Sequence, residues 1–159
     1  MKLFAWCLSV ILLLALQTTL APAISFNDIQ PDFVVCFVLA AALLGGRTPG
    51  TICGFFGGLL QDLATGGILG LHLIPLTIMG YLAGMAERKV FKDHSLLPLL
   101  AAGGATLSEG IFAVFFLKLL GLSLGWGESL YEIVLPQAIY NMAVAVPVYG
   151  LVRLLYRIP

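Results

Sequence analysis

Charged residues are scarce in this chain. Asp, Glu, Lys and Arg make up 10% of its 159 residues, whereas they make up about 25% of an ordinary soluble domain. Hydrophobic residues make up 60%, and the mean hydropathy is +1.06. A soluble fold of this length could not hide so much apolar surface, and exposed apolar patches would cause aggregation. Intrinsic disorder is excluded because the chain is too apolar. The composition therefore predicts an integral membrane protein.

The sequence also lacks an excess of basic residues. Eight basic and eight acidic residues give a formal net charge of zero, which argues against nucleic-acid binding, because that needs a surface rich in Lys and Arg. About six apolar stretches of ~20 residues would use nearly the whole chain. We therefore expect no separate soluble domain.

Cysteine is rare, and enzyme signatures are missing. The three cysteines, Cys7, Cys36 and Cys53, lie within apolar runs and form neither a CxxC motif nor a cluster with histidine. This favours packing residues over a disulfide or a metal site. The sequence has no GxSxG, HExxH or P-loop motif, so it predicts no catalytic, cofactor-binding or metal-binding residues.

What the sequence does contain is a series of six apolar runs. They predict an all-α, polytopic membrane protein built as a six-helix bundle, with a single membrane domain over residues 1–159. The runs cover approximately 3–23, 33–46, 50–64, 68–86, 96–120 and 130–155.

Two of these runs allow more than one interpretation. The first ends at Ala21-Pro22-Ala23, which resembles a signal-peptide cleavage site, but its length favours a retained anchor. The second and third runs are short, since ~15 residues of helix reach only about 23 Å across a ~30 Å hydrocarbon core. A re-entrant hairpin would place Arg47 in lipid, so we favour two short spans, either locally thinning the bilayer or enclosed by neighbouring helices.

The distribution of basic residues predicts the orientation. Six spans put both termini on one side, and seven of the eight basic residues fall on that side or in its loops, which makes it cytoplasmic. Lys118 lies near the outer end of the fifth run and can extend to the surface. Four acidic residues fall outside: Asp28, Asp32, Glu128 and Glu132. The seven basic residues are Lys2, Arg47, Arg88, Lys89, Lys92, Arg153 and Arg157.

A stripe of small residues follows one side of the third run. Gly50, Gly54, Gly58 and Asp62 recur every four residues, with Gly57 beside them, so a helix would align them on one face. Such stripes let two helix backbones approach closely in membranes. The stripe predicts helix packing within the bundle, with a subunit interface or a ligand face as alternatives.

Two sets of polar residues interrupt the later runs. Glu109, in the fifth run, and Gln137 and Asn141, in the sixth, predict a buried polar network that is either structural or a substrate or proton site. Asp62, His72 and Lys118 should all lie near the outer surface, where Asp62 and Lys118 could pair.

The central part of the chain resembles a known family. The run GFFGGLLQDLATGGILGLH over 54–72 has a glycine-rich helix ending in Asp and a Gly-Gly turn, and GYLAG follows over 80–84. These features resemble the rod shape-determining protein MreD family, as do LQTTL over 16–20 and QPD over 30–32.

The resemblance implies a non-enzymatic inner-membrane component of the bacterial cell-elongation machinery. It implies as partners an MreC-like bitopic periplasmic protein and an MreB-like actin filament, and through them a peptidoglycan glycosyltransferase and transpeptidase. The family is also similar in fold to the six-helix substrate-binding subunits of energy-coupling-factor importers. That similarity provides an alternative function, the binding of a small molecule for import.

Two loops are candidate partner surfaces in this interpretation. The cytoplasmic segment with Arg88, Lys89 and Lys92 could contact anionic lipid or a filament, or only fix the topology. The outer loop over 121–132 contains Trp126, Glu128 and Tyr131. It could contact a periplasmic partner, or its aromatic residues could anchor the protein at the interface.

Overall fold

A computed structural model describes residues 2–25, 29–86, 97–122 and 125–157, and these ranges fold into helices without a β-strand. The last three elements, two α-helices and a π-helix between them, form one continuous helical run. The elements are α1 (Lys2–Ala23), α2 (Phe33–Gly45), α3 (Arg47–Thr65), α4 (Leu73–Ala86), α5 (Leu97–Leu119), α6 (Trp126–Glu128), η1 (Ser129–Val134) and α7 (Leu135–Arg157).

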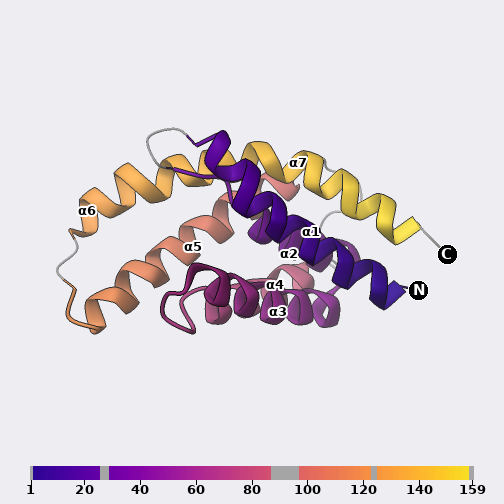
Figure 1. Cartoon of the computed structure of the whole chain (residues 1–159), viewed down its shortest axis with the longest axis horizontal. Helices are drawn as coiled ribbons and strands as arrows, with labels where there is room; N and C mark the ends of the chain where they lie inside the picture. The colour runs from indigo at the N-terminus through magenta and orange to yellow at the C-terminus, as the bar shows by residue number, and fades with distance from the viewer. Residues whose placement is uncertain (1, 26–28, 87–96, 123–124, 158–159) are drawn as a thin grey trace.

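Successive helices run in opposite directions, so the helix ends gather at two ends of the bundle (Figure 1). The N- and C-termini and the junction between α2 and α3 lie at one end, which we call the termini end. The opposite end, which we call the far end, contains residues 29–32, 66–72 and 120–122. At the far end, the hairpin of α5 with α6 extends beyond α2, α3 and α4 (Figure 1).

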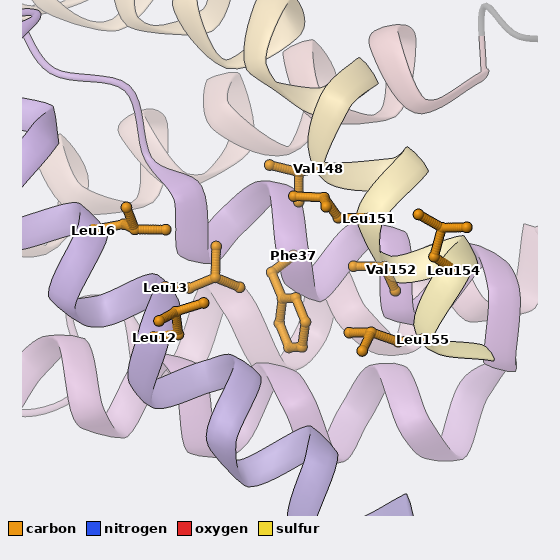
Figure 2. Close-up of a pocket in the computed structure, with 9 residues that line it drawn as sticks. All are labelled: Leu12, Leu13, Leu16, Phe37, Val148, Leu151, Val152, Leu154 and Leu155. Carbon is orange, nitrogen blue, oxygen red and sulfur yellow. The ribbon is translucent and has the colours of Figure 1, made fainter. Parts of the chain in front are cut away.

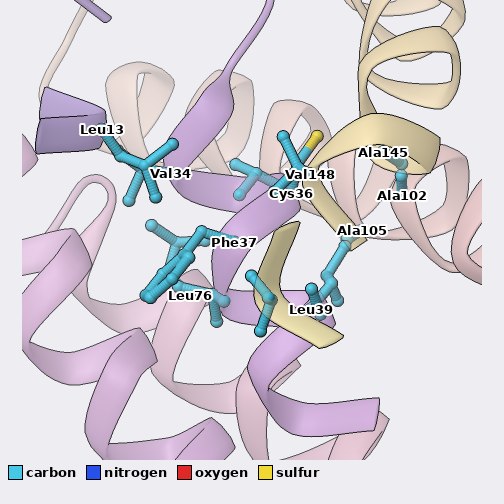
Figure 3. Close-up of a cluster of buried hydrophobic side chains, with 14 residues drawn as sticks. Leu13, Val34, Cys36, Phe37, Leu39, Leu76, Ala102, Ala105, Ala145 and Val148 are labelled. Atoms are coloured by element: carbon cyan, nitrogen blue, oxygen red, sulfur yellow. The ribbon is translucent and has the colours of Figure 1, made fainter. Parts of the chain in front are cut away.

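Helix α2 forms the centre of the bundle. It contacts every other long helix of the described part: α1, α3, α4, α5 and α7. Every residue from Val34 to Leu43 is buried, and α2 supplies much of the apolar cluster in Figure 3, where Leu76 of α4 and Val148 of α7 pack around it. With 13 residues, α2 is about 20 Å long. The neighbouring helices enclose this short helix on all sides.

Three helices begin three or more residues away from the starts predicted from the sequence. Helix α3 begins at Arg47 rather than near residue 50, because Pro49 fits into a first helical turn, where no backbone N–H is needed. Helix α4 begins at Leu73 rather than near residue 68, because Ile68 to His72 form turns. The last helical run begins at Trp126 rather than near residue 130.

The glycine stripe of α3 lies against α4. A Cβ atom added to Gly58 would lie 2.5 Å from Leu73 Cα, and one added to Gly54 would lie 2.8 Å from Leu76 C. Gly57 faces α2 instead, where an added Cβ would lie 3.0 Å from Val34 Cγ1. The stripe therefore packs inside the molecule, where it lets the backbones of α3 and α4 touch.

Helix α4 contributes glycines to the same contact. A Cβ atom on Gly84 would lie 2.6 Å from Arg47 Cα, and one on Gly80 would collide with the backbone of Gly50. The two glycines of the GYLAG segment are therefore the counterpart of the stripe. Close approach of this kind needs glycine on both helices wherever backbone faces backbone.

The outer surface of the bundle is apolar. Large hydrophobic side chains such as Leu100, Leu119, Ile139 and Leu151 are exposed, which a protein of this size tolerates only where lipid or a partner covers them. Two helical stretches, Pro98–Leu119 and Trp126–Tyr156, are long and apolar enough to cross a membrane by length and composition. Three shorter apolar stretches accompany them: Ile11–Ala23, Phe33–Gly45 and Leu73–Met85.

Replacing a stripe glycine should disrupt the contact between α3 and α4. We expect Gly58→Leu and Gly54→Leu to cost about 3 kcal/mol or more, because the new side chains meet backbone that cannot move aside. Thermal unfolding of the purified protein in detergent would measure the loss.

The matched control is Gly104→Leu in α5. Gly104 is exposed, and a Cβ atom there would meet nothing within 4 Å. We expect that substitution to be neutral or slightly stabilising, since leucine favours helix over glycine by roughly 0.5–1 kcal/mol. Equal stability of Gly58→Leu and Gly104→Leu would contradict the packing role.

Candidate functional site

The polar centre of the bundle is the carboxylate of Asp32, which is 4% exposed. Its Oδ1 accepts hydrogen bonds from the backbone N–H groups of Val34 at 2.9 Å and Val35 at 3.0 Å, so Asp32 is the N-cap of α2. Its Oδ2 accepts a short hydrogen bond from Nε2 of Gln61 in α3. The Asp32 side chain thus caps the N-terminus of α2 and joins α3 to it by a hydrogen bond.

Asn141 of α7 reaches the same point from the opposite side. Its side chain is fully buried, and its Oδ1 accepts a hydrogen bond from the backbone N–H of Asp32 at 2.6 Å. Its Nδ2 donates to Thr106 Oγ1 in α5 at 2.8 Å, and the Thr106 hydroxyl donates to Ala102 O. Asn141 therefore links α5 and α7 to the segment that leads into α2.

Gln17 of α1 completes the arrangement. Its Nε2 donates to Pro31 O at 3.1 Å, and its Oε1 accepts from the backbone N–H of Phe33 at 2.7 Å. The two peptide groups that flank Asp32 are thus held by a single side chain amide. We call the five side chains that surround this segment the Asp32 cluster: Gln17, Asp32, Gln61, Thr106 and Asn141.

Two buried oxygens, one within the cluster and one outside it, have no hydrogen-bond partner among the described residues: Gln61 Oε1 and Glu109 Oε1. Glu109 lies three residues after Thr106 in α5 and is partly buried. Unpaired buried acceptors are rare in folded proteins. These two atoms are therefore the least satisfied polar groups of the described core.

The predicted network of Glu109, Gln137 and Asn141 is wrong in its connections. Asn141 is buried, but both functional groups of its side chain are used by Asp32 N and Thr106. Gln137 is half-buried, and neither its side chain nor Glu109 Oε1 has a hydrogen-bond partner within the described part of the chain. The reason is that the chain before α2 enters the bundle and brings its own peptide groups to Asn141.

A second polar arrangement surrounds Asp62, at the end of the glycine stripe. Its Oδ2 accepts from the backbone N–H groups of Gly70 at 2.7 Å and Leu73 at 3.2 Å. Its Oδ1 accepts from the backbone N–H of His72 at 2.9 Å and lies 2.8 Å from His72 Nδ1. The carboxylate thus holds the turn between α3 and α4 and satisfies N–H groups at the start of α4. We call this set of bonds the Asp62 clasp.

Gly66 and Gly70 allow the clasp to form. Their φ angles are +62° and +106°, a region that residues with a side chain rarely adopt. Gly66 ends α3, and Gly70 turns its N–H toward Asp62. The Gly-rich motif between the third and fourth apolar runs therefore encodes this turn.

The predicted pairing of Asp62 with Lys118 is wrong. Lys118 Nζ lies over the ring of Trp126, 5.0 Å from its centroid, whereas both carboxylate oxygens of Asp62 are used by the turn. Of the predicted outer polar cluster, the structure brings together Asp62 and His72 but not Lys118. Among the described residues, the contact of His72 Nδ1 with Asp62 Oδ1 is the one within ion-pair distance, and it is an ion pair only when the imidazole is protonated.

The remaining predicted residues that the structure describes lie at the two ends of the bundle. At the termini end, Arg47 lies 5.9 Å from the centroid of the Tyr81 ring. At the far end, Trp126, Glu128 and Tyr131 are exposed. The basic segment with Arg88, Lys89 and Lys92 lies outside the described residues.

The chemistry of these arrangements is hydrogen bonding between helices. Among the described ranges, no three His, Cys, Asp or Glu side chains are placed to hold a metal ion. Cys36 is buried in α2, with its Sγ 3.4 Å from Asn141 O, and Cys53 is half-buried. The Asp32 cluster and the Asp62 clasp fix the far end of the bundle.

The sequence model of one protein family, described as rod shape-determining protein MreD, matches residues 1–158, essentially the whole chain. The chain belongs to the MreD family. Comparisons with curated proteins and with solved structures gave no match. Membership makes this chain a membrane protein with a role in determining rod shape. Most of the glycine stripe and of the Asp62 clasp, together with Asp32, lie in segments that carried the resemblance.

The sequence predicted Asp32 to fall outside with the other acids of the outer loops, whereas its side chain is buried. Sequence reasoning also missed three further members of the Asp32 cluster: Gln61, Thr106 and Gln17. A signal for each was present. Gln61 precedes Asp62 at the end of the stripe, Gln17 interrupts an apolar run, and Thr106 lies one turn before Glu109. A buried polar side chain in an apolar helix implies a partner on another helix, but the partner could not be identified from spacing alone.

Removing the Asp32 carboxylate should destabilise the bundle. We expect Asp32→Ala to cost about 2–4 kcal/mol, because it removes a helix N-cap worth ~1 kcal/mol and leaves buried donors unpaired at about 1–3 kcal/mol. Thermal unfolding in detergent would measure this change. Glu132→Ala, at an exposed position, is the matched control and should shift the midpoint little. If Asp32→Ala and Glu132→Ala shift the unfolding midpoint equally, the Asp32 carboxylate does not stabilise the bundle as proposed.

Proposed function

We propose that this protein is a non-enzymatic scaffold in the bacterial inner membrane that maintains rod shape by organising lateral peptidoglycan synthesis. The observation that carries the proposal is the MreD match over residues 1–158. The structure supports it, since the side chains of the Asp32 cluster and the Asp62 clasp bond to other parts of the described core. The exposed apolar side chains of its helices remain available for contacts with lipid and partners.

In this proposal the chain is a single membrane domain of six spans with both termini in the cytoplasm. The six spans are α1 to α5 and the continuous run from α6 to α7. The termini lie at the same end of the bundle (Figure 1), together with Arg47, at the start of α3. Lys118 lies at the far end with the described acids Asp62, Glu128 and Glu132. An excess of positive charge at the termini end supports its placement on the cytoplasmic side.

The proposed surface for an MreC-like periplasmic partner is the hairpin at the far end, formed by the end of α5, α6 and η1. It extends beyond the shorter helices (Figure 1). Tyr131 is 74% exposed, and Trp126 is exposed although Lys118 lies over its ring. Aromatic residues are enriched in protein interfaces, where they supply large contact areas. We call these residues, with Ile133, the far-end patch.

The proposed contact for an MreB-like filament is on the cytoplasmic side, at the termini end. Arg153 is exposed there near the end of α7, and the basic segment over 88–92 is predicted to follow α4. Through these two partners the scaffold would position a peptidoglycan glycosyltransferase and transpeptidase. No step of the proposal requires catalysis by this chain.

Depletion followed by microscopy tests the proposed function. A rod-shaped host deprived of its own MreD should become round, and expression of this chain should restore rods. A control strain expressing Gly58→Leu, which disturbs the packing of α3 on α4, should stay round. Cells that remain rods after depletion would overturn the proposal.

The far-end patch can be tested separately. We expect Trp126→Ser with Tyr131→Ser to reduce co-purification of the MreC-like partner about tenfold, because aromatic anchors often contribute 1–2 kcal/mol or more to an interface. The matched control is Leu69→Ser, since Leu69 is 61% exposed in another far-end loop. If the control reduces co-purification as strongly as the double variant, the partner does not bind at the patch.

A further inference from the structure

A groove between α1 and α7 is lined by aliphatic and aromatic side chains, among them Leu13, Phe37 and Val152 (Figure 2). These side chains offer no hydrogen bond or charge that could select a particular ligand. The unsatisfied polar side chains of the described core lie elsewhere, in α3 and α5. Their chemistry is more specific.

Glu109 in α5 carries a buried oxygen that no described donor satisfies. Its Oε1 is enclosed without a hydrogen-bond partner, although the residue as a whole is only partly buried. Glu109 lies 12 residues after the start of α5 and 10 before its end, so at least about 15 Å of helix separates it from either end. An ionised carboxylate in such a place needs donors or a counter-charge, because its burial is otherwise very unfavourable.

The charges that act on Glu109 are negative. Asp32 and Asp62 lie close enough to interact electrostatically with its carboxyl group, and Cys36 of α2 is a further titratable group within this range. An ionised Glu109 would therefore add a third carboxylate charge to this part of the core. The described basic side chains are placed elsewhere: His72 at Asp62, Lys118 over Trp126, Arg47 over Tyr81, and Arg153 near the end of α7.

The other elements that pack against α5 supply no counter-charge from their described residues. Helix α4 has no acidic or basic residue, and the acidic residue of η1, Glu132, is exposed. Helix α7 contributes Asn141, but the side chain of Asn141 is used by Asp32 N and Thr106. The described part of the protein thus leaves the Glu109 carboxyl group without a cationic partner.

Gln61 of α3 presents a second unpaired oxygen at the same level of the bundle. Its side chain is 6% exposed, and its Nε2 donates to Asp32 Oδ2, whereas its Oε1 has no donor. Asn141 connects the Asp32 segment to Thr106 in α5. Glu109 follows Thr106 by three residues, which is about one helical turn. Glu109 and Gln61 therefore approach the Asp32 segment from different helices.

Both unpaired oxygens are hydrogen-bond acceptors. An ionised carboxylate can only accept hydrogen bonds, whereas a protonated carboxyl group has one O–H donor. A proton on Glu109 therefore removes the buried charge and supplies a donor at the same time. Gln61 Oε1 is the other buried side-chain oxygen of the described core that lacks a donor. One hydrogen bond from Glu109 would satisfy it.

We propose that Glu109 is a proton-binding site in the core of the bundle, and that the protonated carboxyl group donates a hydrogen bond to Gln61 Oε1. This bond joins α5 directly to α3. Release of the proton leaves a carboxylate beside Asp32 and Asp62 and breaks the bond to Gln61, so it loosens the Asp32 cluster. The site rests on burial and hydrogen bonding, and it is independent of the membrane arrangement and partners proposed above.

Infrared spectroscopy tests the presence of the proton. A protonated carboxyl group has a C=O stretching band that an ionised carboxylate lacks. We expect the whole protein in nanodiscs at neutral pH to show such a band, and Glu109→Gln to lose it. The matched control is Glu132→Gln, which removes an exposed acid and should leave the band unchanged. Identical spectra of the unchanged protein and Glu109→Gln would show that Glu109 is ionised, and would overturn the proposal.

The acceptor is tested by changing two amides of the Asp32 cluster separately. Gln61→Leu removes the proposed acceptor and should shift the C=O band. Gln17→Leu removes an amide whose two groups bond to peptide groups beside Asp32, and it should leave the band in place. A band at the same position in Gln61→Leu and the unchanged protein would refute the bond to Gln61. If Gln61→Leu misfolds, the spectra of the unchanged protein and Glu109→Gln still decide whether Glu109 holds a proton.

Hydrogen–deuterium exchange tests the effect of proton release. The pH is raised until the C=O band is lost, and exchange rates are corrected for the intrinsic effect of pH. We expect exchange at Val34 and Val35, which bond to Asp32, to rise about tenfold, as expected when one buried hydrogen bond is lost. Glu109→Gln has no proton to release, and its amide can still donate to Gln61, so its exchange should not rise. An equal rise in both proteins would refute the effect of the proton on the Asp32 cluster.

Discussion

The peptide segment that leads into α2 carries polar groups into the apolar centre of the bundle, and each of those groups needs a partner there. Asp32 supplies the partner for the first N–H groups of α2, and Asn141 supplies one for the N–H of Asp32 itself. Gln17 holds the peptide groups on both sides. The side chains that bond to this segment belong to different helices. Forming all the hydrogen bonds of the segment therefore fixes the positions of α1, α3 and α7 around α2.

The packing of α3 on α4 follows a different principle. Glycines at Gly54 and Gly58 remove side chains from the contact, so that backbone atoms touch, and dispersion forces replace the hydrophobic effect, which is weak between helices in lipid. The Asp62 clasp closes the same pair of helices at the far end. Backbone packing thus stabilises the α3–α4 pair along the helices, and the hydrogen bonds of the Asp62 clasp stabilise it at the far end.

The sequence predicted the features that depend on local pattern. Hydropathy identified the helices, the four-residue spacing identified the stripe, and the Gly-Gly motif identified the turn after α3. It did not predict the partners of Asn141 or Lys118, because those depend on which distant segments meet. Asn141 bonds to a peptide group of the segment before α2, and no periodicity in α7 encodes that contact. Lys118 contacts Trp126 across a short hairpin. Its predicted depth in the membrane does not distinguish Trp126 from Asp62 as its partner.

The hydrogen bond between Asp32 and Asn141 joins residues 109 positions apart, and this separation has a consequence for biogenesis. Residues of the hairpin α3–α4 lie close in the chain, so the clasp between Asp62 and Gly70 can close while synthesis continues. The N–H of Asp32, by contrast, must wait for the last helix to emerge from the ribosome. A nascent chain truncated before α7 therefore carries an unpaired polar group at its centre, and the bundle can close around this segment only after α7 is made.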